Sequence, residues 1–341
     1  MTQAPSFAVI SGAQVHDAVA GREKQVTGMV EAAYRLHGEG QTVNPDSYFL
    51  RFPDRPSDRI IALPASVKGD VGVHGIKWIS SFPGNVANGI PRASAVLILN
   101  DAETGYPFAC LESSIISAAR TAASAALAAA ALADARGDRP RRVGFIGAGL
   151  IARYIHTYLA GNGFTFDALG VHDLSAEHAA GFKGYLERTE KGHITIHDTA
   201  ESLIRSSDLV VFATVAGEPH VTDPAWFAHN PLVLHVSLRD LSPEIILGSC
   251  NIVDDVEHCM KANTSPHLAE QQVGHRDFVD GTLYDVLTGK TTPPAGRPVV
   301  FSPFGLGVLD LAVASYVYNE LSASGALQTV PGFFHDLNRY G

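Results

Sequence analysis

The segment RVGFIGAGLIA, residues 142–152, constrains the fold of this 341-residue chain more than any other stretch. An apolar run enters Gly147-Ala148-Gly149 and continues as a helix, with Ala152 where a third small residue belongs. The first glycine permits a tight turn, the second lets the backbone approach a pyrophosphate, and the small third residue packs helix on strand. N–H groups at the helix start then receive the phosphates. The segment predicts a dinucleotide-binding unit.

A second apolar run, ALGVHD at 168–173, ends in Asp173 at the separation typical of such units. A carboxylate there binds ribose hydroxyls, and no arginine follows it directly to receive a 2′-phosphate, so NAD is favoured over NADP. The alternative is a glycine turn that binds no ligand, which the order of strand, helix and acidic residue disfavours. The predicted cofactor-binding residues are Gly147, Ala148, Gly149, Leu150, Ile151, Asp173, Thr214 and Ser302.

The rhythm of apolar runs changes along the chain. From Arg141 onward, strand-like runs alternate with helical stretches, which favours a doubly wound parallel sheet. Earlier runs, broken by Pro and Gly, favour an antiparallel or mixed sheet. Helices are expected over 15–36, 113–137 and 308–323, the last returning to the first domain. The predicted fold class is α/β: a Rossmann-type sheet, residues 126–307, inserted in a mixed α+β substrate and dimerisation domain, residues 1–125 with 308–341.

Composition restricts the partners and the compartment. Asp and Glu (35) outnumber Lys and Arg (25), giving a net charge of -10, so nucleic acid and membrane surfaces are not expected as partners. Cys110, Cys250 and Cys259 are too far apart to predict a disulfide framework or a zinc site, and no metal is predicted. The first residues lack the features of a signal peptide. A cytoplasmic protein is expected.

Three charged residues stand out by their position. Lys77 lies inside the apolar strand pattern GIKWIS, and Arg120 interrupts a helix of small residues. Charges so placed are either solvated at an edge or recruited to a ligand, and the pattern alone does not decide between the two. Asp240 ends LVLHVSLRD, where a doubly wound sheet presents the crevice at the carboxyl ends of its strands.

Several motifs together resemble the ornithine cyclodeaminase and mu-crystallin superfamily, over about residues 11–318. They are KWISSFPGN (77–85), the stretch 101–132 with its RTAA motif, GAGLIA and FSPFGLGVLD (301–310). The resemblance implies a homodimer with an inserted Rossmann domain. It also implies that Asp240 and Lys77 are catalytic and that Arg51 and Arg120 bind a substrate carboxylate.

Segments 235–259, 264–278 and 302–311 resemble one branch of this superfamily, whose members oxidise N-(2-amino-2-carboxyethyl)-L-glutamate. Cyclodeaminases carry Gly-Gly-Asp where this chain has Leu238-Arg239-Asp240, an acid near Ala62 and a threonine where Arg92 aligns. Losing an acid and gaining an arginine fits a substrate with additional carboxylates. The resemblance therefore implies NAD-dependent oxidative hydrolysis to 2,3-diaminopropionate, 2-oxoglutarate and NADH, in siderophore or antibiotic biosynthesis.

In this reaction Arg51, Arg92 and Arg120 would hold carboxylates, Asp240 would act as general base on the attacking water, and Lys77 would assist. Three alternatives remain: an ornithine or lysine cyclodeaminase, an imino-acid (ketimine) reductase, and a non-catalytic NAD(P)-binding protein like mu-crystallin. The joint presence of Lys77, Arg120 and Asp240 disfavours the non-catalytic protein but does not separate the three enzymes.

Overall fold

The computed structural model describes residues 5–69 and 71–335. The chain falls into two compact units: Met1–Arg120 with Leu306–Gly341, here the terminal unit, and Thr121–Gly305, here the central unit. The first boundary follows Arg120, inside one continuous helix and a few residues before the position expected from the sequence. The substrate and cofactor roles assigned to the two parts of the chain remain predictions.

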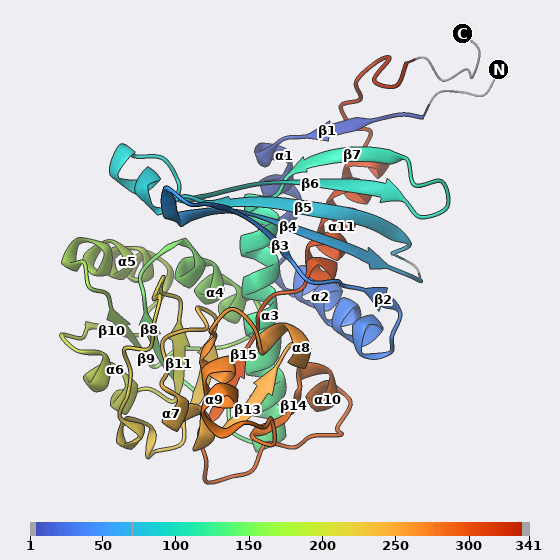
Figure 1. The fold of residues 1–341 in the computed structure, drawn as a ribbon. Coiled ribbons are helices and arrows are strands. Elements are labelled where there is room, and N and C mark those ends of the chain that lie inside the picture. The colour runs from blue at the N-terminus through green and yellow to red at the C-terminus, as the bar shows by residue number, and fades with distance from the viewer. Residues whose placement is uncertain (1–4, 70, 336–341) are drawn as a thin grey trace. The chain divides into compact units, whose positions relative to one another are not determined.

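The terminal unit is built on a mixed sheet (Figure 1). Its order is β1-β7-β6-β5-β4-β2, with β3 also paired to β4, and its pairs are antiparallel except β1 with β7. The strands are β1 (Ala8–Ile10), β2 (Thr42–Val43), β3 (Tyr48–Phe52), β4 (Arg55–Val67), β5 (Val73–Ser81), β6 (Ala93–Asp101) and β7 (Pro107–Glu112). The expected mixed sheet is confirmed.

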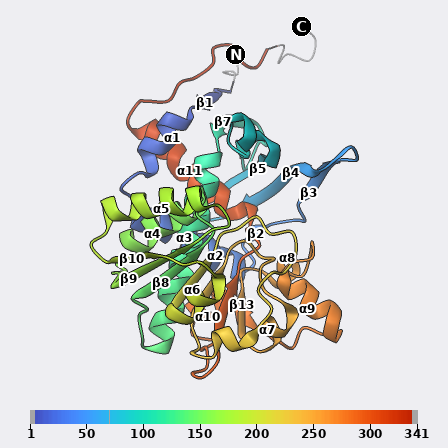
Figure 2. The same cartoon turned by 90° about the vertical axis from the view of Figure 1, so that its left-hand side faces the viewer.

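Helices α1 (Gly12–Val19), α2 (Glu23–Gly38) and α11 (Gly307–Ala323) and the 3-10 helix η1 (Pro83–Asn88) complete the terminal unit. Helix α11 packs against β4, β5 and β6 and contacts α1 and α2, and Figure 2 shows it beside α1. The expected return of this last helix to the first domain is confirmed. The single helix expected over 15–36 is wrong, because Gly21 adopts φ +72 and separates α1 from α2.

The central unit contains an all-parallel sheet of order β10-β9-β8-β11-β12-β15-β13-β14, which confirms the doubly wound fold. Its strands are β8 (Arg142–Ile146), β9 (Ala168–His172), β10 (His193–Ile196), β11 (Leu209–Phe212), β12 (Leu232–His235), β13 (Cys250–Val253), β14 (Val279–Thr282) and β15 (Val299–Ser302). The chain goes from β8 outward to β10 and then returns to β11 on the other side of β8. Ligands bind such folds at this switch point, beside the carboxyl ends of β8 and β11.

The helices of the central unit cover this sheet, and α5 lies against β9 and β10 at one edge (Figure 2). They are α4 (Leu150–Gly161), α5 (Ala176–Thr189), α6 (Ala200–Ser206), α7 (Pro243–Leu247), α8 (Val256–Cys259), α9 (Ser265–Val273), α10 (Leu283–Leu287) and η2 (Pro224–Phe227). Helix α3 (Ser114–Arg136) runs through the unit boundary. It is long and apolar enough to cross a membrane, but 67% of its apolar window is buried, as in the core helix of a folded domain.

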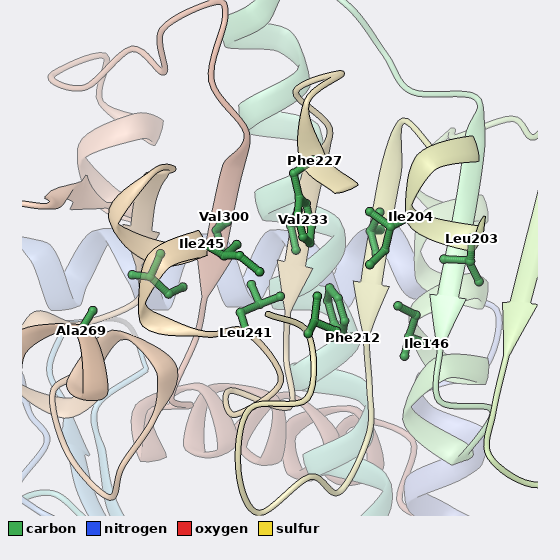
Figure 3. Close-up of a cluster of buried hydrophobic side chains, with 13 residues drawn as sticks. Ile146, Leu203, Ile204, Phe212, Phe227, Val233, Leu241, Ile245, Ala269 and Val300 are labelled. Carbon is green, nitrogen blue, oxygen red and sulfur yellow. The ribbon is translucent and has the colours of Figure 1, made fainter. Parts of the chain in front are cut away.

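A cluster of buried apolar side chains holds one side of the parallel sheet (Figure 3). Phe212 and Val233 project from neighbouring strands and meet Ile204 from α6 and Ile245 from α7. Each large side chain buried this way contributes about 1.5–3 kcal/mol. This packing makes the strand ends a rigid support for the loops that follow them.

Candidate active site

The glycine turn after β8 has the geometry of a phosphate cradle. Gly147 adopts φ +92, and a Cβ there would lie 2.6 Å from the carbonyl oxygen of Ala213, so only glycine fits. Gly149 is the N-cap of α4 and provides no side-chain cap, and a Cβ built on it would meet no described atom within 4 Å. Gly149 and Leu150 are exposed, so the N–H groups at the start of α4, which have no side-chain cap, lie at the surface, where they can bind an anion.

Asp173 lies directly beside this turn. Its carboxylate accepts hydrogen bonds from the N–H groups of Ala148 and Ser175, both at 2.8 Å. The side chain is 18% exposed, and the next residue, Leu174, is fully exposed. An acceptor for ribose hydroxyls thus adjoins the donors for a pyrophosphate, and these residues fit NAD.

The other predicted cofactor residues differ in accessibility. Leu150 is 54% exposed in the first turn of α4, and Ile151 follows it, half-buried. Thr214 follows β11 at the switch point and donates a hydrogen bond to Asp240. Ser302 is buried, and its hydroxyl lies 3.3 Å from Nδ1 of His235.

Asp240 follows β12, and its carboxylate is fully buried. Its Oδ1 accepts a hydrogen bond from Thr214 and lies 3.1 Å from Nε2 of His220. Its Oδ2 accepts one from Ser237 at 2.5 Å and lies 3.2 Å from Nε2 of His235. Burial acts to raise the pKa of Asp240, but hydrogen bonds from His220 and Ser237 and the adjacent imidazole of His235 outweigh it and lower that pKa well below its usual range. The predicted catalytic aspartate is therefore ionised at neutral pH.

The turn that presents Asp240 is strained. Leu238, where cyclodeaminases carry glycine, adopts φ +70, a left-handed conformation that costs a residue with a Cβ about 1–2 kcal/mol. The carbonyl of Leu238 accepts a bond from the Ser265 N–H at 2.7 Å, and the guanidinium of Arg239 donates to the Ala262 carbonyl at 2.8 Å. These tertiary bonds hold the strained turn, as is typical of functional sites.

In the terminal unit, Lys77 and Arg120 share one buried carboxylate. Nζ of Lys77 lies 2.7 Å from Oδ2 of Asp310, and Nε of Arg120 lies 3.1 Å from Oδ1 of the same residue. Lys77 also lies 3.3 Å from the hydroxyl of Ser117. The pKa of Lys77 is lowered to about 8. Burial and the charge of Arg120 lower it, and Asp310 raises it. The structure thus brings together two predicted site residues and adds Asp310, which sequence analysis did not assign.

Three arginines gather on the same face of this sheet. Arg51 and Arg59 are directly opposite each other on β3 and β4, and Arg59 is opposite Ser81 on β5. The guanidinium of Arg92 donates to the hydroxyl of Ser81 at 2.7 Å. Ser81 and Lys77 lie an even number of positions apart on β5, so their side chains point to the same face. The separation of four residues corresponds to about 13 Å along the strand.

These three guanidinium groups repel one another. Within residues 5–69 and 71–335, Arg51, Arg59 and Arg92 form no ion pair with a carboxylate. Burial and then the charge of Arg51 lower the pKa of Arg59, and burial and then Arg59 lower the pKa of Arg92. Like charges on opposing strand positions destabilise a sheet. Arg59 and Arg92 are half-buried and Arg51 is exposed. A cationic cluster of this kind can bind a carboxylate.

Residues 12–325 match the model of the ornithine cyclodeaminase/mu-crystallin family. The chain belongs to this family. It is 28% identical to N-((2S)-2-amino-2-carboxyethyl)-L-glutamate dehydrogenase of Staphylococcus aureus, over 84% of this chain and 87% of that protein. The crystal structure of CmnK is 30% identical with a TM-score of 0.85, covering 97% and 99% of the two chains.

An archaeal alanine dehydrogenase dimer with bound NAD is 25% identical, with a TM-score of 0.84 and coverage of 96% and 100%. The predicted family and fold class are confirmed, and the predicted cofactor agrees with this NAD complex. The names of these relatives refer to different substrates. Family membership therefore places the chain among NAD(P)-dependent enzymes of amino and imino acids.

Asp310, Arg59 and His220 are charged or titratable members of these clusters that were not predicted from the sequence. Asp310 lies in FSPFGLGVLD, a segment used for the resemblance without a role for its acid. Arg59 precedes the apolar run IIALPA and looks like an ordinary strand-edge charge. His220 lies in the loop GEPHV, where no motif marks it. Only its hydrogen bond to Asp240 identifies it.

Proposed function

We propose that this protein catalyses the NAD-dependent oxidative hydrolysis of N-(2-amino-2-carboxyethyl)-L-glutamate to 2,3-diaminopropionate, 2-oxoglutarate and NADH in the cytoplasm. The observation that carries the proposal is the arginine cluster Arg51, Arg59 and Arg92 on the sheet face that also bears Lys77. A substrate with several carboxylates matches this density of unpaired guanidinium groups. The side-chain amine of ornithine or lysine would be repelled by it.

Two groups of basic residues bind the carboxylates of the substrate. Arg120 and Lys77 hold the carboxylate nearest the reacting carbon, with Asp310 fixing both cations. Arg51, Arg59 and Arg92 hold the distal carboxylates. Guanidinium groups suit this task because they bind carboxylates in bidentate geometry and stay charged.

Gly147, Gly149 and Asp173 would hold NAD through its pyrophosphate and ribose. When bound, this cofactor accepts the hydride that leaves the glutamate α-carbon. The resulting substrate imine is hydrolysed by water, and the proton of that water is handled by Asp240 and the groups bonded to it. The positioning of the α-carbon is the protein's main contribution to the hydride step.

We also propose that the protein is a homodimer formed through the exposed face of the sheet in the terminal unit. Tyr48, Trp78 and Val96 lie in one row across β3, β5 and β6, and they are 72%, 41% and 43% exposed. An apolar row of this kind on a monomer is typical of an interaction surface. The archaeal relative is a dimer, which supports a dimeric state but does not bear on which face forms the interface.

The test is NADH formation by the purified protein with NAD and N-(2-amino-2-carboxyethyl)-L-glutamate, in parallel with ornithine, lysine and alanine. We expect NADH and 2-oxoglutarate in equal amounts from the first substrate only. Ammonia from ornithine or lysine without net NADH would instead establish a cyclodeaminase. Oxidation of NADH with a cyclic imino acid, and no reaction in the other direction, would establish a ketimine reductase.

A further inference from the structure

Asp240 is poorly placed to take a proton from water. Its side chain is 0% exposed, and each of its carboxylate oxygens already has two polar neighbours. The four neighbouring groups are the hydroxyls of Thr214 and Ser237 and the imidazoles of His220 and His235. A general base must be within hydrogen-bond reach of the proton that it abstracts. The side chain of Asp240 is fully buried, so its carboxylate is not exposed to water.

His220 is the accessible member of this group. Its side chain is 42% exposed, whereas that of His235 is 0% exposed. Within the described part of the chain, no group forms a hydrogen bond with Nδ1 of His220. The backbone adds two further ties, because the N–H groups of His220 and Val221 donate to the carbonyl of Asp240 at 3.0 and 2.9 Å. The ring is therefore held at Asp240 while its far side faces solvent.

The pairing defines which nitrogen of His220 can act. Asp240 is ionised, so Nε2 of His220 carries the hydrogen that it donates to Oδ1 across 3.1 Å. In the neutral ring, Nδ1 then has the lone pair. A buried carboxylate that fixes the tautomer and orientation of a histidine is the arrangement by which Ser-His-Asp enzymes prepare their general base.

We propose that His220, through Nδ1, is the general base and acid of the reaction, and that Asp240 is a positioning residue that orients it. This inference rests on the proposed function. Loss of hydride from the carbon of the secondary amine leaves an iminium, whose nitrogen already carries a proton. Nδ1 takes one proton from water as the water oxygen bonds to the iminium carbon, which gives a carbinolamine. The imidazolium then gives this proton to the nitrogen, and as the C–N bond breaks and the carbonyl forms, Nδ1 takes the hydroxyl proton and releases it to solvent. One water is consumed, and no further oxidant or reductant is needed.

Two further observations support this assignment. His220 and Asp240 follow β11 and β12, at the carboxyl ends of these strands and next to the switch point. Thr214 donates a hydrogen bond to Asp240, and the carbonyl of Ala213 lies close to Gly147. The low pKa of Asp240 also makes its carboxylate a weak base. The charged group in contact with the ring is the carboxylate of Asp240.

The experiment compares His220→Ala and His220→Gln with the wild type, using His193→Ala as the control for loss of an exposed imidazole in the same unit. We expect kcat to fall about 100-fold or more in both His220 variants, with NAD affinity within about 2-fold of wild type, and no change in the control. Added imidazole should restore part of the activity of His220→Ala. The fall of kcat at acid pH should be absent in His220→Gln, which keeps a donor to Asp240 but has no base.

The outcomes separate the two proposals. If the wild type forms no NADH from any amino-acid substrate, the proposed function fails and this inference fails with it. If the wild type is active and His220→Gln keeps at least a third of its kcat, or keeps the acid fall of the pH profile, the inference alone is overturned. If imidazole does not rescue His220→Ala, the pH profile of His220→Gln decides, since a residue with only a structural role would leave its shape unchanged.

Discussion

The ammonium group of Lys77 on β5 and the carboxylate of Asp310 on α11 form a buried ion pair of 2.7 Å, although 233 positions separate them in the chain. Arg120 bonds the other oxygen of the same carboxylate. One acid thus compensates two buried cations. Burial lowers the pKa of Lys77 and Asp310 partly offsets that effect, which leaves the pKa at about 8.

The first prediction concerns Asp310→Asn. Removing this charge removes the effect that raises the pKa of Lys77, so that pKa should fall below about 8. Lys77 is cationic only below its pKa, so the alkaline fall of kcat/KM should move to lower pH. The free energy of unfolding should also fall by about 3–5 kcal/mol, because Lys77 and Arg120 lose their buried partner.

A pH–rate profile and thermal denaturation measure the two effects of Asp310→Asn. Asp277→Asn is the control, because its side chain is 90% exposed. An unchanged alkaline limb in an active Asp310→Asn protein would show that the charge of Lys77 does not support substrate binding.

Arg59→Gln should separate stability from function. The change removes one of three mutually repelling guanidinium groups, so the free energy of unfolding should rise by up to about 1 kcal/mol. KM for N-(2-amino-2-carboxyethyl)-L-glutamate should rise about 10-fold or more, because a charged bond to a carboxylate is lost. Steady-state kinetics measure the change in KM, and chemical denaturation measures the change in the free energy of unfolding.

The matched control for Arg59→Gln is Arg55→Gln on the same strand. Arg55 stacks on Phe52 and Phe82 and lies 3.9 Å from Asp58, so its charge is already partnered. An equal rise of KM in the two variants would exclude a specific carboxylate site at Arg59.

Asp173→Ala should weaken NAD binding about 10-fold while leaving the fold intact. The carboxylate supplies the predicted ribose contact, and it also holds the N–H groups of Ala148 and Ser175 beside the phosphate turn. Isothermal titration with NAD measures the change, with Asp198→Ala, an exposed acid of the same unit, as the control. Unchanged affinity would remove Asp173 from the cofactor site.

Trp78→Glu should convert the proposed dimer to monomers. The substitution places a charge in the centre of the exposed apolar row formed with Tyr48 and Val96, where a partner would have to desolvate it. Sedimentation velocity distinguishes the two states, and Leu174→Glu, at a fully exposed position of the central unit, is the control. A Trp78→Glu protein that stays dimeric would assign the interface to another surface.

Much of the fold could be predicted because it depends on rules that act over a few residues. Alternation of apolar runs and helical stretches is enough to indicate a parallel sheet. Gly147 indicates a tight turn, at a position where a Cβ would clash with the backbone. The break between α1 and α2 was missed because a single glycine, Gly21, ends one helix inside a stretch of good helix formers. Strand β14 was missed because VDGT has no apolar pattern.

By itself, the sequence determined the two kinds of sheet, the phosphate turn with its acid, and the candidate residues Lys77, Arg120 and Asp240. The tertiary structure decided which groups these residues meet. Asp310 reaches Lys77 because α11 returns across the first sheet, Arg59 opposes Arg51 through strand register, and His220 meets Asp240 where two loops leave adjacent strands. These contacts depend on packing between segments that are distant in the chain, so no local sequence pattern predicts them.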